Sequence, residues 1–149
     1  MKRTFLATVL SIVFAMVAIA CHSSDEKEIG YAELPVQAQQ FVKQYFPSAT
    51  YSHVEKEKDH GKWEYEVLLS DGTKIDFNNK GEWISVDCKY STLPAGIIPD
   101  AIVADIAQRY PSQQPYKIEK ETGGYEIDIP GFDLYYSSNG KFIRAEIDR

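Results

Sequence analysis

The stretch Lys62-Trp63-Glu64-Tyr65-Glu66-Val67-Leu68-Leu69 alternates large apolar and acidic side chains. Alternation with a period of two places successive side chains on opposite faces of a β-strand. The stretch therefore predicts a strand with one face in a core and the other, which carries Glu64 and Glu66, in water. The same rhythm returns at Gly124-Tyr125-Glu126-Ile127-Asp128-Ile129 and predicts a second strand of this kind.

The correspondence between the two strands extends along most of the chain. Apolar residues at helical spacing precede each set of strands, and glycine-containing turns separate the strands. The matching boundaries are Leu34-Pro35 with Ile98-Pro99 and Phe46-Pro47 with Tyr110-Pro111. We therefore expect an α+β fold of two tandem copies, residues 31–90 and 91–149, each with one helix packed on a four-stranded antiparallel meander. We expect the two sheets to join edge to edge as one joint domain, which leaves a broad concave face away from the helices.

The N-terminus has the layout of a secretory signal peptide. Lys2 and Arg3 form a short positive region, and an almost unbroken apolar run follows from Phe5 to Ala20. A membrane-spanning helix needs about 20 apolar residues, and this run is shorter. We therefore predict a signal peptide over residues 1–20 and an exported protein.

Cys21 is the predicted site of lipidation. Ala18-Ile19-Ala20-Cys21 resembles a bacterial lipobox, although the first position is usually Leu, and a polar, acidic tether follows over residues 21–30. This favours a lipoprotein, either periplasmic or anchored to the outer membrane through Cys21. The alternative is cleavage near Ala20 and a free product, in which a Cys21–Cys88 disulfide becomes an option. Cys88 shares the alternation of Val86, so we expect it to be a small buried core residue.

The composition argues against several classes of function. The net charge is −6, and it becomes more negative once Lys2 and Arg3 are removed, so nucleic-acid binding has no support. The three histidines include no pair at metal-ligand spacing, and neither a nucleophile elbow nor a phosphate-binding glycine loop is present in the sequence. We therefore expect no enzyme, no cofactor, no catalytic residue and no metal site.

The open face of the sheet is the predicted binding surface. Counted by strict alternation, Trp83, Tyr135 and Phe142 fall on the face away from the helices, where large aromatic side chains ringed by polar groups would favour partner binding. The alternative is that each of these aromatics sits at a strand end and packs on a loop. The carboxylates expected on the same face are Glu64, Glu66, Asp76, Glu126 and Asp128. Solvated acids are common on antiparallel strands, but an acidic face also favours a basic or extended polypeptide partner.

The duplicated pattern resembles the PepSY-like, beta-lactamase-inhibitor-like family of small exported proteins, which is common in Bacteroides-type bacteria. The residues that carry this resemblance are Leu34-Pro35, Tyr45-Phe46-Pro47, Trp63-Glu64-Tyr65-Glu66-Val67, Asp71-Gly72 and Lys80-Gly81-Glu82-Trp83. The resemblance covers about Ile29 to Arg149 and implies the tandem helix-on-sheet fold of beta-lactamase inhibitor proteins. It implies little about activity.

The expected function is therefore a non-enzymatic protein-binding module of the cell envelope, with inhibition of the partner as one form of that role. A periplasmic protein that binds a small ligand or a divalent cation is the alternative, and it predicts carboxylates that converge around a pocket. A hydrolase is the third hypothesis, and it predicts an acid or histidine with a strongly perturbed pKa in a cleft.

Overall fold

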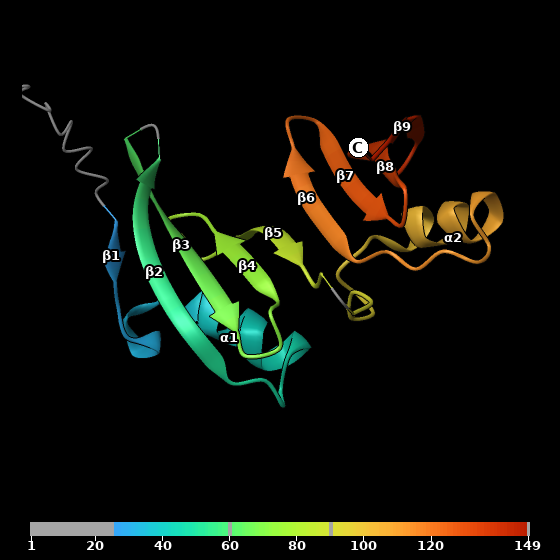
Figure 1. Ribbon diagram of the computed structural model, residues 1–149. Coiled ribbons are helices and arrows are strands. Elements are labelled where there is room, and N and C mark those ends of the chain that lie inside the picture. Colours follow the sequence, from blue (N-terminus) through green and yellow to red (C-terminus); the bar gives the residue numbers. More distant parts are fainter. Residues whose placement is uncertain (1–25, 60, 90, 149) are drawn as a thin grey trace, which may run out of the picture.

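The computed structural model describes residues 26–59, 61–89 and 91–148 (Figure 1). The predicted signal peptide and Cys21 therefore lie outside the described residues. No helix in the described part of the chain is both long enough and apolar enough to cross a membrane.

The described chain forms one nine-stranded sheet in which each strand pairs antiparallel with its neighbour in sequence (Figure 1). The strands are β1 (Lys27–Glu28), β2 (Tyr51–Asp59), β3 (Lys62–Leu69), β4 (Lys74–Phe77), β5 (Trp83–Asp87), β6 (Lys117–Glu121), β7 (Gly124–Ile129), β8 (Phe132–Ser137) and β9 (Phe142–Ile147). The predicted α+β class with an antiparallel sheet is confirmed. β1 was not predicted, because it lies within the segment expected to be a tether.

Two helices, α1 (Val36–Tyr45) and α2 (Asp100–Arg109), cover the same face of the sheet, and a short 3₁₀ helix, η1 (Tyr31–Glu33), precedes α1. Pro35 and Pro99 stand immediately before the helices, as the sequence predicts. Phe41 of α1 packs edge-on against Phe77 of β4, with 5.7 Å between ring centroids. On α2, Asp105 accepts a 2.9 Å hydrogen bond from the hydroxyl of Tyr136 in β8. The strand register places Phe77 and Tyr136 on one face, which we call the helix face.

A single core runs along the helix face. It includes Val67, Ile75, Val86, Ile118, Ile127 and Leu134, all with no exposed surface. Cys88 belongs to this core and is 2% exposed, as predicted. Burial raises the pKa of its thiol to about 11, so the thiolate that would make it reactive is disfavoured.

β5 and β6 join the two halves of the sheet. Ser85 pairs with Glu119, Val86 with Ile118, and Asp87 with Lys117. The expected edge-to-edge joining is therefore observed, and it makes the core continuous across the seam. The face opposite the helices, which we call the open face, is likewise continuous.

A β-bulge near the start of β5 and another near the start of β9 overturn part of the sequence analysis. Phe77 pairs with Trp83 and Asp76 with Ser85, so Ile84 has no partner in this register. In β9 the same shift leaves Ile143 without a partner, because Tyr136 pairs with Phe142 and Tyr135 with Arg144. Along a regular strand, odd-numbered and even-numbered residues lie on opposite faces of the sheet. An extra residue in one strand exchanges these two faces on the far side of the bulge. Predictions made by uninterrupted alternation therefore fail at these two sites.

Trp83 and Phe142 consequently lie on the helix face and not on the open face. The ring of Trp83 packs on Phe41 of α1, with 6.2 Å between centroids. Phe142 packs edge-on against Tyr136 at 5.6 Å, and the guanidinium of Arg109 in α2 lies 4.1 Å from its ring centroid. Both residues are partly buried against the core. Of the three predicted open-face aromatics, Tyr135 alone has its predicted position.

Two turn glycines bring the β-hairpins against the helix N-termini. Gly81 has a φ of +83°, and a Cβ there would lie 2.7 Å from Cβ of Pro35 and 2.9 Å from the main-chain nitrogen of Ala38. Gly140 has a φ of +81° and approaches Ala101 of α2 in the same way, with 3.0 Å to its Cβ. Only glycine combines this backbone conformation with so close an approach.

Candidate binding face

The open face carries many more carboxylates than cations. Strand register assigns to it Glu28, Glu55, Glu57, Glu64, Glu66, Asp76, Asp87, Glu119, Glu121, Glu126, Asp128, Asp133 and Glu146, together with Lys62, Lys74, Lys117, Arg144 and His53. The five predicted carboxylates are all in this group, and Tyr135 lies on the same face as the cross-strand partner of Glu126. The sheet therefore brings together side chains from both halves of the chain.

The most unusual feature of the open face is a line of directly opposed acids, which we call the carboxylate row. Each member is the cross-strand partner of the next, except that Ser85 separates Asp76 from Glu119. The row consists of Glu28, Glu55, Glu66, Asp76, Glu119 and Glu126. Like charges directly opposite each other on neighbouring strands are destabilising.

Lys74 lies beside two members of the row. Its Nζ is 2.7 Å from Oε2 of Glu66 and 3.7 Å from Oδ1 of Asp76. The hydrogen bond with Glu66 raises the pKa of Lys74. Burial nevertheless raises the pKa of Asp76 to about 6, because it outweighs the opposing effect of Lys74, and the charges of Glu66 and Glu57 add to it.

Lys117 has the corresponding place in the second half. Its Nζ is 3.3 Å from Glu119, 3.9 Å from Glu126 and 3.4 Å from Asp128. Partial burial acts to lower the pKa of Lys117, but the nearby carboxylates of Asp128 and Glu119 raise it overall. Asp128 is 7% exposed, its Oδ1 is buried without a hydrogen-bond partner, and burial raises its pKa to about 6.

His53 completes the pattern at the β1 end. Its Nε2 is 2.9 Å from Oε2 of Glu55 and its Nδ1 is 3.6 Å from Oε1 of Glu28. The hydrogen bond with Glu55 raises the pKa of His53. Each of His53, Lys74 and Lys117 is thus shared by two members of the carboxylate row, which leaves part of the row's negative charge uncompensated.

A hollow of about 330 Å³ lies on the open face where the two halves meet. Ser85 lies in it, and the longer side chains of Glu64, Asp76, Lys74, Lys117 and Glu119 stand around it. The small serine within the line of longer side chains explains the depression. Converging carboxylates around a pocket are what the ligand-binding hypothesis predicts, but here two lysines share the space.

Tyr135 stands at the far end of the open face, stacked under Arg144. The guanidinium carbon of Arg144 is 3.6 Å from the ring centroid, a cation–π geometry. Burial and a hydrogen bond with Glu126 raise the pKa of Tyr135 to about 12. Tyr135 is therefore a neutral, partly buried aromatic next to the acids.

The sequence analysis missed Lys117, Asp87, Glu119 and His53 as members of the open face. Each lies on a strand whose sequence alternates only briefly, so its face becomes clear only from the pairing with a neighbouring strand. The register gives this directly, since Asp87 faces both Lys74 and Lys117.

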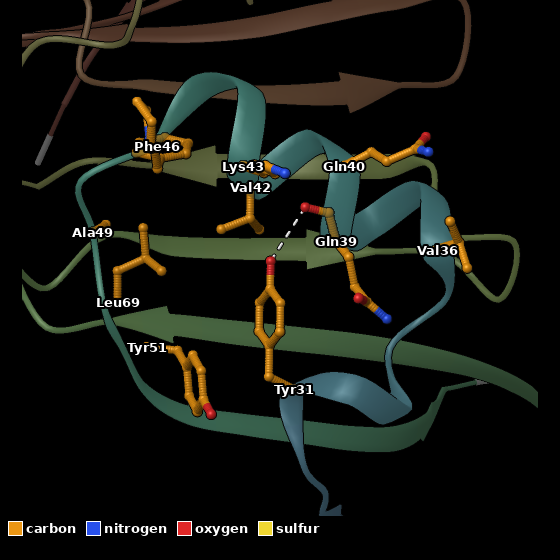
Figure 2. A pocket seen from close by; sticks show the side chains of 11 residues that line it. Tyr31, Val36, Gln39, Gln40, Val42, Lys43, Phe46, Ala49, Tyr51 and Leu69 are labelled. Carbon is orange, nitrogen blue, oxygen red and sulfur yellow. Dashed lines mark hydrogen bonds between the residues drawn. The ribbon is translucent and has the colours of Figure 1, made fainter.

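A pocket of about 470 Å³ lies on the helix face, beside α1 (Figure 2). Tyr31 and Tyr51 line it and stack with 4.9 Å between centroids, and the hydroxyl of Tyr31 donates a 3.2 Å hydrogen bond to the carbonyl of Gln39. Val42 and Leu69 line its apolar part. Its described lining residues include no carboxylate, so this pocket does not match the converging carboxylates that the alternative of a small-ligand or cation-binding protein predicts.

No group of three or more His, Cys, Asp or Glu side chains within the described ranges is arranged to hold a metal ion. The hydrolase hypothesis predicted a perturbed acid in a cleft. Asp76 does have a raised pKa in the hollow, and Glu66 faces it from β3. Lys74 contacts both of these carboxylates, and we assign Asp76 no catalytic role.

Comparison with known proteins gives a consistent picture. The sequence profile of the family described as "Putative beta-lactamase-inhibitor-like, PepSY-like" matches residues 63–144. A solved Bacteroides vulgatus structure described as a putative periplasmic protein has 33% identity and a TM-score of 0.79, with 83% of this chain and 98% of that chain covered. A second, from Bacteroides thetaiotaomicron, is described as a putative calcium-regulated periplasmic protein and has 33% identity and a TM-score of 0.79, with coverages of 82% and 97%.

A third structure, also from Bacteroides vulgatus, has 30% identity and a TM-score of 0.78 and covers 81% of this chain and 98% of that chain. Among curated proteins, none matches this sequence. The profile match spans more than half of the chain, and the solved structures are matched over nearly their whole length. The chain belongs to the PepSY-like, beta-lactamase-inhibitor-like family.

Proposed function

We propose that this protein is a non-enzymatic binding module of the cell envelope that holds a basic polypeptide on its open face. The observation that carries this proposal is the carboxylate row. Directly opposed acids disfavour the folded sheet, and burial of Asp76 and Asp128 adds to that cost. Lysine or arginine side chains of a partner would relieve both effects. The carboxylate row would therefore cost less free energy in a complex than in the free protein.

The shape of the face agrees with an extended or convex partner. The hollow at Ser85 accepts a side chain, and Tyr135 offers an aromatic contact further along. Because Trp83 and Phe142 lie on the helix face, the contact is mainly electrostatic, with fewer aromatic anchors than the sequence suggested. Such an interface is selective for charge and weakens in salt. An enzyme inhibited by this protein is one form that the partner could take.

The setting of this function is the periplasm. Three related structures are described as periplasmic proteins, and the N-terminal sequence has the layout of a signal peptide. We further propose that Cys21 carries a lipid anchor and that the two helix-plus-four-strand halves are tandem copies of one unit. The two bulges and the two docked turn glycines at corresponding places support the duplication.

The proposal is tested by capture from envelope extract with three baits. The first is the wild type, and the second is Glu66→Gln, Glu119→Gln, Glu126→Gln, which neutralises part of the row. The third is a matched control, Glu33→Gln, Glu82→Gln, Asp100→Asn, which removes the same charge from exposed acids elsewhere. We expect the wild type and the control to capture the same protein and the row variant to lose it.

The captured protein is then purified and titrated against each bait at about 50 mM and about 500 mM salt. We expect its affinity for the wild type to fall with salt, and the salt dependence to be smaller for the row variant. The same proteins captured by all three baits would contradict binding through the open face.

A second candidate function is binding of a divalent cation, which the description of the Bacteroides thetaiotaomicron relative as calcium-regulated favours. Thermal unfolding in calcium, in magnesium and in a chelator tests it. If calcium acts at the open face, it will raise the melting temperature of the wild type more than that of Asp76→Asn or Asp128→Asn. Equal shifts in all three proteins would exclude this face as the calcium site.

A further inference from the structure

β9 is an edge of the sheet with incomplete protection, since it has the bulge at Ile143 and the charged residues Arg144 and Glu146 but no proline. Within the described residues it pairs with β8 and has no strand on its other side. Ile143 is 58% exposed and Ile147 is 72% exposed. The strand contains neither proline nor lysine, which are two of the residues that commonly prevent edges from pairing. The other edge ends in the two-residue β1, whose residues are both charged and exposed.

The main-chain groups of β9 are oriented to accept another strand. The amide of Asp148 donates a 3.2 Å hydrogen bond to the carbonyl of Gly131, which fixes the alternation along the strand. In an antiparallel ladder every second residue points its N–H and C=O to the same neighbour. Arg144 and Glu146 therefore point these groups toward β8, and Ala145 and Ile147 point theirs away from the sheet.

β5 shows how such an edge is used in this fold. Val86 has the place in β5 that Ala145 has in β9, two residues beyond the bulge, and it pairs with Ile118 of β6. The neighbouring amide of Cys88 donates to the carbonyl of Tyr116 at 2.8 Å. The outward N–H and C=O groups of Ala145 and Ile147 in β9 thus correspond to the groups of Val86 and Cys88 through which β5 pairs with β6.

We propose that these outward main-chain groups pair with β9 of a second copy of the chain. The two strands run antiparallel and are related by a two-fold axis at Ala145. In that register Arg144 lies opposite Glu146 of the second copy, on both sides of the axis. These are non-hydrogen-bonded positions, where facing side chains come closest. Ile143 lies opposite Ile147, so the exposed apolar side chains are covered together. The sequence Arg144-Ala145-Glu146 is therefore complementary to itself, which selects a second copy over an unrelated strand.

The two-fold axis is perpendicular to the sheet, so the open faces of both copies point the same way and stay uncovered. The dimer therefore does not depend on the proposed binding function. One added strand pair is at the small end of specific interfaces. We expect a reversible dimer with a Kd on the order of 10 μM.

Charge reversal tests the register. Arg144→Glu places acids opposite acids across the axis, and Glu146→Arg places bases opposite bases. We expect each variant to dimerise at least about tenfold more weakly than the wild type. An equimolar mixture of the two should recover wild-type affinity as a heterodimer, because every facing pair is then of opposite charge. Mixing cannot restore the contact between Arg144 and Glu146 within one chain (2.9 Å), so this recovery is specific to pairing between copies.

A main-chain variant tests the edge itself. Ala145→Pro removes an N–H that points away from β8 and should abolish dimers, while circular dichroism and the melting temperature report whether the fold is kept. All variants are measured by light scattering over a concentration series of the full chain in mild detergent. A wild type that stays monomeric up to about 1 mM, or a mixture no more dimeric than its components, would overturn the proposal.

Discussion

At the scale of single residues, Asp76 shows how burial and ion pairing compete on the open face. Burial raises its pKa to about 6 from an ordinary value of 3.8, although Lys74 lies 3.7 Å away. A carboxyl group with a higher pKa in the folded state binds a proton more readily there than in the unfolded chain. The contribution of Asp76 to the stability of the folded state is therefore largest below about pH 4. It is lost as pH rises toward 6 and above.

Asp76→Asn should reduce this pH dependence. The amide has no proton to lose, so the variant should lose about 1–2 kcal/mol less stability than the wild type between pH 4.5 and pH 7.5. Urea unfolding at several pH values measures the difference. Glu121→Gln, at the exposed end of β6, is the control and should follow the wild-type curve. Parallel curves for Asp76→Asn and the wild type would show that burial does not dominate at this site.

Single-residue placement was predictable from the sequence wherever alternation runs without interruption. Glu64, Glu66, Glu126 and Asp128 lie in strands of six or eight residues and occupy the predicted face. Trp83 and Phe142 come next to the bulges, and one unpaired residue is enough to move them to the other face. No residue pattern marks the bulges in the sequence. A bulge arises where two residues of one strand lie opposite one residue of the next, so it depends on the pairing of both strands.

At the scale of elements, the helices were predictable and β1 was not. Proline before each helix, apolar spacing within it and proline after it are local signals, and both helices begin and end where these predict. A two-residue strand has no periodicity, and β1 forms because the edge of β2 is available, where Ile29 donates a 3.0 Å hydrogen bond to Val54. The sequence around Lys27 and Glu28 does not show that the edge of β2 is free to pair.

The docking of each hairpin turn on its helix gives a prediction at this scale. Gly81→Ala adds a methyl group against Pro35 and against the backbone of Ala38, in addition to the cost of a positive φ. Gly123 has a similar φ of +87° with nothing within 4 Å of an added Cβ, so Gly123→Ala is a matched control. We expect Gly81→Ala to cost about 1–3 kcal/mol more than the control in chemical denaturation. Equal costs would mean that the turn moves freely away from α1.

At the scale of the whole molecule, the β5–β6 seam should make the two halves unfold together. Both tryptophans, Trp63 and Trp83, lie in the first half, so fluorescence reports on that half while circular dichroism reports on the whole sheet. We expect the two urea curves to coincide. Val86→Ala should lower stability by about 2 kcal/mol and Ile118→Ala by about 3 kcal/mol, with both probes still moving together.

Because these two side chains face each other across the seam, the double variant should differ from the sum of the single variants by about 0.5–1 kcal/mol. Fluorescence and circular dichroism midpoints that separate in the wild type would show instead that the halves are independent units.

The order of the strands has a consequence for how the chain reaches its folded state. Each strand from β3 to β9 pairs with the strand made just before it, and β1 pairs with β2 once β2 has been made. Pairing in sequence order lowers the contact order relative to a sheet with crossover connections, and a lower contact order favours faster folding. A chain that leaves a translocation channel from its N-terminus could therefore add one strand after another as it emerges, and β9 would be the last to join.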